Sequence, residues 1–200
     1  MAADGFDRFV VVDVETTGLY NSDRVVEVAA VTLATGGRIV DEWDSLVNPG
    51  RDVGPTHIHG VTASMVSAAP CFEEVAEALA ARVDGAVLVA HNLVFDARML
   101  TNEYGRLGAV MDPGRGVCTL LQCGGRLEDA CAMYGVELHQ HHRALADARA
   151  TARLLTAAKC RADGASPARV GSFSTLPVLA LSVGTRSLPT PTRACHIWRE

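Results

Sequence analysis

The chain has 200 residues, with 18 basic and 23 acidic side chains, a formal net charge of −5 and 48% apolar residues. These values are ordinary for a globular protein and exclude a chain disordered throughout, a collagen and a basic protein that coats nucleic acid. None of the six cysteines forms a C-x-x-C pair, which argues against a zinc ribbon. No apolar run reaches the ~20 residues of a spanning helix, and residues 1–8 lack the basic and apolar segments of a secretory signal. We therefore expect a cytoplasmic protein with no membrane partner.

Composition and charge both change near residue 162. The segment Ala162–Pro167 is typical of a helix end followed by a linker. From residue 161 on, five arginines stand against only Asp163 and Glu200. The sequence therefore predicts one domain over residues 1–161 and a tail over 162–200, which either packs back on the domain or binds a partner.

Hydrophobic periodicity predicts strands first and helices later. Three β-branched runs predict strands, with a hairpin turn at Gly36-Gly37 between the last two: residues 9–15, 25–33 and 38–47. Residues 49–70 have the composition of a loop. Further along, helices are predicted over 72–83, 95–107, 127–134 and 143–159, and strands over 86–90 and near 117–121. This order indicates an α/β or α+β domain in which helices cover one mixed sheet.

Two carboxylates interrupt the first apolar strand. Asp13 and Glu15 lie in Val-Val-Val-Asp-Val-Glu, two residues apart, so a strand would point both to the same face. An uncompensated buried carboxylate is costly, and two neighbouring ones need a cation or a shared proton. The plainer alternative is a strand-end aspartate that only caps the following turn.

Two more segments carry polar residues where core elements begin. An apolar strand ends in His91-Asn92, and Asp96 follows in the first turn of the next helix. An aspartate there often only complements the helix dipole. The last long helix opens with His142-Arg-Ala-Leu-Ala-Asp147. A histidine at a helix start is often only solvent-exposed.

Taken jointly, the three segments predict a metal centre. Asp13, Glu15, Asp96 and Asp147 offer hard carboxylate oxygens without cysteine or multiple histidine ligands, which suits Mg²⁺ or Mn²⁺ rather than zinc. Such a set can hold two cations about 3.5–4 Å apart, which clamp both reacting oxygens of a phosphodiester.

The three motifs resemble those of the DEDDh, or DnaQ-like, 3′–5′ exonucleases, similar to the proofreading ε subunit of bacterial DNA polymerase III. The matching segments are Asp13-Val-Glu15-Thr16-Thr17-Gly18, His91-Asn92-Leu-Val-Phe95-Asp96 and His142-Arg-Ala-Leu-Ala-Asp147. The resemblance covers about residues 9–158 and implies an RNase H-like fold with a mixed five-stranded sheet. One departure is Val117-Cys118-Thr119, where the family has an acidic residue.

The resemblance implies a role for each matching residue. Asp13, Glu15, Asp96 and Asp147 would hold two Mg²⁺ or Mn²⁺ ions, and His142 would be the general base that deprotonates the attacking water. Thr16 and Thr17 would meet the terminal nucleotide. His91, Asn92 and Phe95 would shape the substrate face, with Phe95 equally well explained as a core residue.

A cluster of histidines makes the register of the last motif important. Besides His142, the chain has His139 and His141, but only His142 has the spacing to Asp147 that the motif requires. Because adjacent residues do not share a helix face, we expect His141 to point elsewhere.

The charge balance favours a short single-stranded 3′ end as substrate. Two divalent ions would neutralise the four site carboxylates, so the negative net charge does not exclude nucleic acid. It argues against wide wrapping of duplex, which needs many basic contacts. The predicted activity is release of nucleoside 5′-monophosphates from single-stranded DNA in proofreading or repair, with a DNA polymerase subunit as a candidate partner. The alternatives are an RNA-trimming enzyme and a catalytically idle module that binds nucleic acid or a polymerase.

Overall fold

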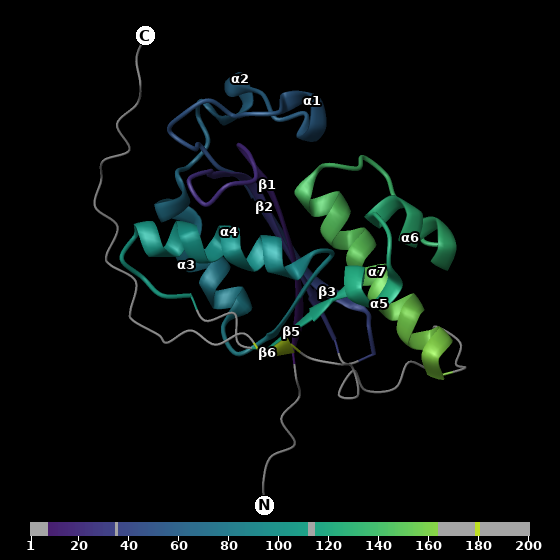
Figure 1. Ribbon diagram of the computed structural model, residues 1–200. Helices are drawn as coiled ribbons and strands as arrows, with labels where there is room; N and C mark the ends of the chain where they lie inside the picture. Colours follow the sequence, from purple (N-terminus) through teal and green to yellow (C-terminus); the bar gives the residue numbers. More distant parts are fainter. Residues whose placement is uncertain (1–7, 35, 112–114, 164–178, 181–200) are drawn as a thin grey trace, which may run out of the picture.

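One mixed sheet organises the molecule (Figure 1). The computed structural model describes residues 8–34, 36–111, 115–163 and 179–180. The strands lie in the order β3-β2-β1-β4-β5-β6. Their bounds are β1 Phe9–Thr16, β2 Val25–Leu33, β3 Ile39–Leu46, β4 Val87–Ala90, β5 Arg115–Cys118 and β6 Leu179–Ala180. The first three strands are antiparallel, and β4 pairs in parallel with both β1 and β5.

The five predicted strands and the mixed sheet are confirmed. The sheet gains a sixth strand from the tail, because the two residues of β6 pair antiparallel with β5. Helix α7 continues to Asp163, two residues beyond the predicted boundary. Residues 164–178 and 181–200 lie outside the described ranges, and so does most of the composition change near residue 162. The domain boundary therefore stays a prediction.

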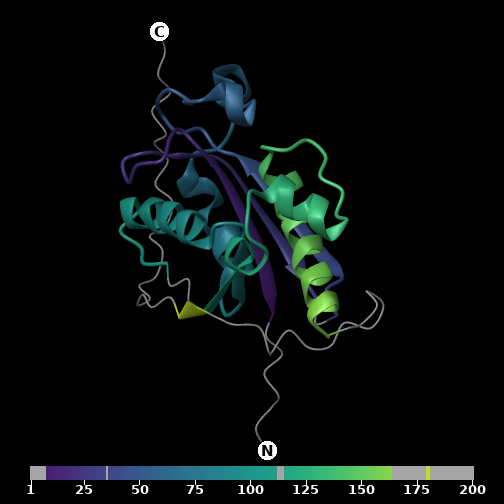
Figure 2. The same ribbon diagram turned by 45° about the vertical axis from the view of Figure 1, so that its right-hand side comes forward.

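Helices cover both faces of the sheet (Figure 2). They are α1 Thr56–His59, α2 Ala63–Val66, α3 Phe72–Val83, α4 Leu93–Arg106, α5 Thr119–Cys123, α6 Leu127–Tyr134 and α7 Ala144–Asp163. One core, with α3 and α4, takes Val10, Val12 and Val14 of β1. The other, with α7, takes Phe9 and Val11. Since strand residues alternate between faces, the odd-numbered residues of β1 lie on the α7 face.

Two of the predicted elements differ from the structure. The loop predicted over residues 49–70 contains α1 and α2. Gly60 in the left-handed region (φ 70°) ends α1, and the Thr62 side chain accepts a hydrogen bond from the Met65 N–H at the start of α2. The strand predicted over 117–121 ends at Cys118, where α5 begins. Helices of four or five residues are too short for a periodicity signal, which explains both differences.

None of the helices in the described ranges is both long enough and apolar enough to cross a lipid bilayer.

Candidate active site

Strand β1 brings Asp13 and Glu15 to the face that α7 covers. Asp13 pairs with Ala29 and Glu15 pairs with Glu27 of β2, with a register shift directly after Glu15. Helix α7 packs on β1 and β2 through Ala144, Ala148 and other small or aliphatic residues. Small side chains in the first turns allow close approach, and Asp147 on α7 thereby reaches the two strand carboxylates.

Three carboxylates converge at the end of β1. One carboxylate oxygen from each of Asp13, Glu15 and Asp147 lies within 4.8 Å of the other two, and Asp147 is buried. This confirms the geometric expectation that the first and third motifs meet.

Asp96 completes the acidic group from the other face of the sheet. It lies in the first turn of α4, is 4% exposed, and its Oδ1 accepts a hydrogen bond from the Val14 N–H at 3.2 Å. It is not among the three carboxylates within 4.8 Å, but it is the carboxylate that acts most strongly on Asp13. The hydrogen bond holds the start of α4 against β1, so Asp96 is more than a dipole-complementing residue.

The carboxylates repel one another in a poorly solvated place. Burial, and then the charges of Asp96 and Asp147, raise the pKa of Asp13 well above its ordinary value. Burial, followed by Asp147 and Glu27, raises the pKa of Glu15 to about 8, and burial raises that of Asp96 to about 7. Hard oxygen ligands with too little positive charge around them are the donor set that Mg²⁺ or Mn²⁺ would neutralise, so these residues fit divalent cations.

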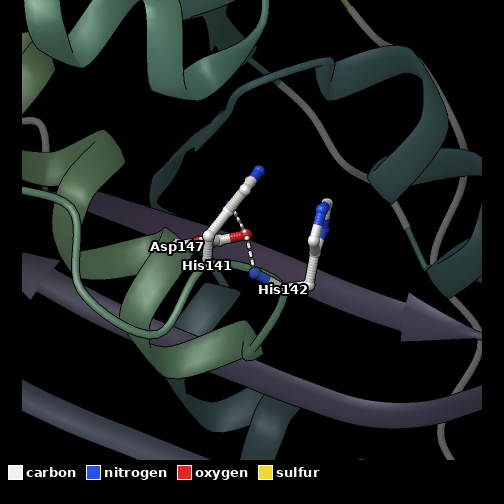
Figure 3. Close-up of side chains that lie close together, drawn as sticks. All are labelled: His141, His142 and Asp147. Carbon is white, nitrogen blue, oxygen red and sulfur yellow. Dashed lines mark hydrogen bonds and ion pairs between the residues drawn. The ribbon is translucent and has the colours of Figure 1, made fainter. Parts of the chain in front are cut away.

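His141 and His142 both lie at the site (Figure 3). The His141 Nδ1 is 2.9 Å from Asp147 Oδ2, and the two imidazole rings stack with centroids 3.7 Å apart. The His142 backbone N–H donates to Asp147 Oδ2 at 3.0 Å. The expectation that His141 points elsewhere is therefore wrong. The helix rule does not apply, because both residues precede α7 and His142 has a left-handed backbone (φ 64°), which turns the two rings to one side.

An open cavity of about 530 Å³ leads to these groups. Its lining combines the acidic and histidine residues of the site with residues from β4 to α6: Asp13, His141, His142, Asp147, His91, Asn92, Leu120 and residues 125–128. The His91 ring is held by the Thr119 hydroxyl at 2.9 Å and the Gly125 carbonyl at 3.1 Å. Thr119 thus has a structural use in the stretch that departs from the family pattern.

The other predicted substrate residues are held mainly by intramolecular contacts. The Thr16 hydroxyl donates to the Gly18 carbonyl at 2.7 Å, and the Thr17 hydroxyl donates to Asp23 at 3.1 Å. A Cβ on Gly18 would meet Asp23 Oδ2 at 2.5 Å, so a larger residue there would displace the Asp23 side chain that holds the turn. Phe95 lies in the first turn of α4, packs against the core that includes α3 and α4, and is not among the residues that line the cavity. The substrate roles of these three residues remain predictions.

The sequence reasoning missed a second buried carboxylate in the next strand. Glu27 is 1% exposed and accepts hydrogen bonds from the Arg143 guanidinium, the shortest at 2.7 Å, and from the Ala144 N–H at 3.1 Å. Glu27 therefore caps the N-terminus of α7, which begins two residues after His142. The signal was the same as for Asp13, a carboxylate inside an apolar run, here Val25-Val-Glu-Val-Ala.

Glu128, in the first turn of α6, was also missed. Its Oε2 lies 2.8 Å from the His141 Nε2, so His141 connects α6 to Asp147 of α7. No sequence spacing links residues 128 and 141, because the contact depends on how the two helices pack.

Comparisons with known proteins agree with this geometry. Residues 10–155 match a family model described as "Exonuclease". The chain is 38% identical over 171 residues to a DNA polymerase III subunit epsilon-like protein of Rhodobacter capsulatus, covering 76% of this chain. It is 37% identical over 161 residues to the PolC-type DNA polymerase III of Bacillus subtilis, covering 74% of this chain. The chain spans only 24% and 11% of the length of these two relatives.

Solved structures of exonucleases are similar in fold to this chain. The structure of exonuclease X with 5′-overhanging duplex DNA is 29% identical, with a TM-score of 0.62 over 82% of this chain and 97% of that one. The nuclease domain of 3′hExo, a DEDDh family member bound to rAMP, is 17% identical, with a TM-score of 0.69 over 90% and 100% of the two chains. The second likeness shows the shared fold alone. Since the family match spans all three motifs and the motif carboxylates converge, the chain belongs to the exonuclease family, with the motif set of its DEDDh 3′–5′ members.

Proposed function

We propose that this site hydrolyses the terminal phosphodiester at the 3′ end of single-stranded DNA and releases nucleoside 5′-monophosphates. The observation that carries the proposal is the convergence of Asp13, Glu15 and Asp147 within 4.8 Å, beside His142 and an open cavity. A module that only bound nucleic acid would have no need of carboxylates held at such an electrostatic cost.

The carboxylates would hold two Mg²⁺ or Mn²⁺ ions. Asp13, Glu15 and Asp147 converge and would bind one ion, Asp13 would also bind the second, and Asp96 would complete the set directly or through water. The ions would supply charge that offsets the developing negative charge on the phosphate oxygens.

His142 would accept the proton of the attacking water. Its ring lines the cavity and its backbone is fixed through Asp147. An imidazole has the proton affinity that a general base needs near neutral pH.

The cavity walls would position the terminal nucleotide. His91 and Asn92 line the same cavity as Asp13, and the turn of Thr16 and Thr17 would hold the 3′-hydroxyl through its backbone. Phe95 would contribute by packing under the N-terminal end of α4.

DNA is favoured over RNA because the relatives at 37–38% identity carry DNA polymerase III names, and the solved relative at 29% identity is titled as a complex with DNA. The role would be proofreading or repair in the cytoplasm, with a DNA polymerase subunit as a partner. The alternative is a 3′–5′ exoribonuclease, since the same fold occurs in a 3′-exonuclease that recognises a histone mRNA stem-loop.

Matched end-labelled DNA and RNA oligomers test the proposal. With Mg²⁺ or Mn²⁺, we expect stepwise shortening of DNA from the 3′ end, slower shortening of RNA and none with a chelator. A 3′-phosphate should slow digestion sharply, because the 3′-hydroxyl would lie at the Thr16–Thr17 turn. Equal rates on blocked and free ends, or release of 5′-terminal nucleotides first, would contradict the polarity. Faster digestion of RNA would favour the alternative.

A further inference from the structure

The two metal-binding groups at the site differ in chemistry but share one residue. Asp13, Glu15 and Asp147 offer oxygen only, whereas His141, His142 and Asp147 offer two imidazole nitrogens and one oxygen, again within 4.8 Å of one another. Mg²⁺ prefers the first set, and zinc-class ions prefer nitrogen ligands.

We propose that His141, His142 and Asp147 form a separate binding site for a Zn²⁺-class divalent ion, and that its occupation excludes the catalytic ions. The inference rests on the proposed function only for this second clause, because binding of the ion itself depends only on the three side chains.

The contacts of His141 support a ligand role. Its Nδ1 faces Asp147 at 2.9 Å, while its Nε2 lies 2.8 Å from Glu128 Oε2. A metal-bound histidine usually donates its other ring N–H to a carboxylate, which fixes the tautomer and the ring orientation. Glu128 occupies the position of this outer carboxylate. The Glu128–His141 pair therefore leaves the His141 Nδ1 facing Asp147, where the ion would bind.

The backbone before α7 supports the second nitrogen. Left-handed φ angles at Gln140 (54°) and His142 (64°) bring the His141 and His142 rings into a stack at 3.7 Å. Non-glycine residues avoid this region, so two within three positions indicate a loop whose shape is imposed by its contacts. The result is two ring nitrogens within 4.8 Å of one carboxylate. Because the lone pair of an imidazole nitrogen lies in the ring plane, the stacked rings would have to rotate about their side-chain bonds for both nitrogens and Asp147 to bind one ion, with the fourth tetrahedral position left open.

Occupation of this site would inhibit the enzyme through two residues. Asp147 cannot serve both groups fully, and a nitrogen of His142 that binds the ion has no free lone pair for a proton. Cavity access is open on this side, since His141 keeps 27% of its side-chain surface exposed and lines the cavity with His142.

The test is a zinc titration of the metal-free protein, followed by calorimetry and by the visible absorption of Co²⁺ as a spectroscopic substitute. We expect one site in the wild type, about 10–100-fold weaker binding in Glu128→Gln, and loss of the Co²⁺ bands in His141→Ala. His139→Ala is the matched control, because His139 is exposed and its ion pair within the described residues is with Glu137 rather than with the site, and it should bind zinc as the wild type does. Excess Mg²⁺ should raise the apparent zinc Kd of the wild type through the shared Asp147.

Asp13→Asn separates the two sites. It should lose the Mg²⁺-induced rise in melting temperature and keep zinc binding, whereas His141→Ala should lose zinc binding and keep the Mg²⁺ effect. Unchanged zinc affinity in both His141→Ala and Glu128→Gln, with circular dichroism showing folded proteins, would overturn the zinc site. Absence of Mg²⁺-dependent digestion in the wild type would instead overturn the proposed function and leave the zinc result standing.

Discussion

Two sets of buried carboxylates differ in the protein charges around them. Glu27 and Glu103 have arginine partners within 3.4 Å, whereas the Asp13 group is surrounded mainly by other carboxylates, and Arg143 is the weakest of the influences on the pKa of Glu15. Glu27 is neutralised by Arg143, and Glu103, also 1% exposed, lies 2.8 Å from Arg24 and 3.4 Å from Arg106. The charges acting on Asp13 are all carboxylates.

This contrast separates structural acids from functional ones. Glu27 caps α7, and Glu103 accepts the Val25 N–H at the start of β2, so each joins distant segments. Asp96 and Asp147 of the Asp13 group also accept backbone hydrogen bonds, but the group gathers like charge in one place, which a cation or a proton from solution would offset. The comparison predicts opposite responses to mutation.

Asp13→Asn should have the largest effect. Removing a shared ligand should reduce turnover beyond the ~10²–10⁴-fold that general-base removal costs, because the ions themselves are lost. It should also raise the melting temperature in a chelator, since one repelling carboxylate is gone, and abolish most of the Mg²⁺-induced rise. Oligomer digestion and thermal unfolding, each with Mg²⁺ and with chelator, measure this. If Asp13→Asn were less stable than the wild type in chelator, the contrast between the two sets of carboxylates would be contradicted.

His142→Ala should reduce kcat by about 10²–10⁴-fold while keeping the Mg²⁺-induced stabilisation. The wild-type rate should rise with pH through the imidazole range, and this limb should flatten in the variant. His139→Ala is the control and should retain the wild-type profile. Near-normal turnover in His142→Ala would remove the general-base assignment.

Much of this site could be predicted from sequence because each motif sits where an element starts or ends. The buried strand around Asp13, the strand end at His91 and the helix start at Asp147 all carry local signals, and the sheet topology then brings them together.

The remaining features depend on tertiary packing and had weaker local signals or none. The Glu128–His141 contact arises from α6 lying beside α7, and the stacking of His141 on His142 arises from backbone angles that no propensity scale assigns to histidine. The Glu27 signal was present in the sequence, but its partner Arg143 is 116 residues away and could not be identified by spacing.

Glu27→Gln should lower the free energy of unfolding by about 1–3 kcal/mol, because Arg143 loses its charged partner and the α7 cap weakens. The loss should be similar with and without Mg²⁺, in contrast to Asp13→Asn. Glu42→Gln is the matched control: its pair with Arg149 is more exposed and should contribute only about 0–1 kcal/mol. Urea unfolding measures both. A Glu27→Gln loss that vanishes on adding Mg²⁺ would place Glu27 with the functional acids.

The smallest expected effect is a pH trend in the metal-free protein. The pKa values of Glu15, about 8, and Asp96, about 7, lie above their ordinary values of 4.5 and 3.8, so the folded state holds more protons than the unfolded state between these limits. The free energy of unfolding should therefore fall as pH rises from about 6.5 to about 8.5.

The pH window also separates the carboxylates from the histidines. Burial lowers the pKa of His59 and His91, which makes stability rise with pH, but this effect is nearly complete above about pH 7, where free imidazole is neutral. Thermal unfolding in chelator across the window should show the decline, and the Mg²⁺-induced rise in melting temperature should be larger at about pH 8 than at about pH 6.5, because ionised carboxylates bind the cation. Asp13→Asn should flatten both trends, whereas Glu42→Gln should leave them unchanged. If metal-free stability rose with pH in the wild type, the Asp13 group would have to be compensated within the protein, as Glu27 and Glu103 are.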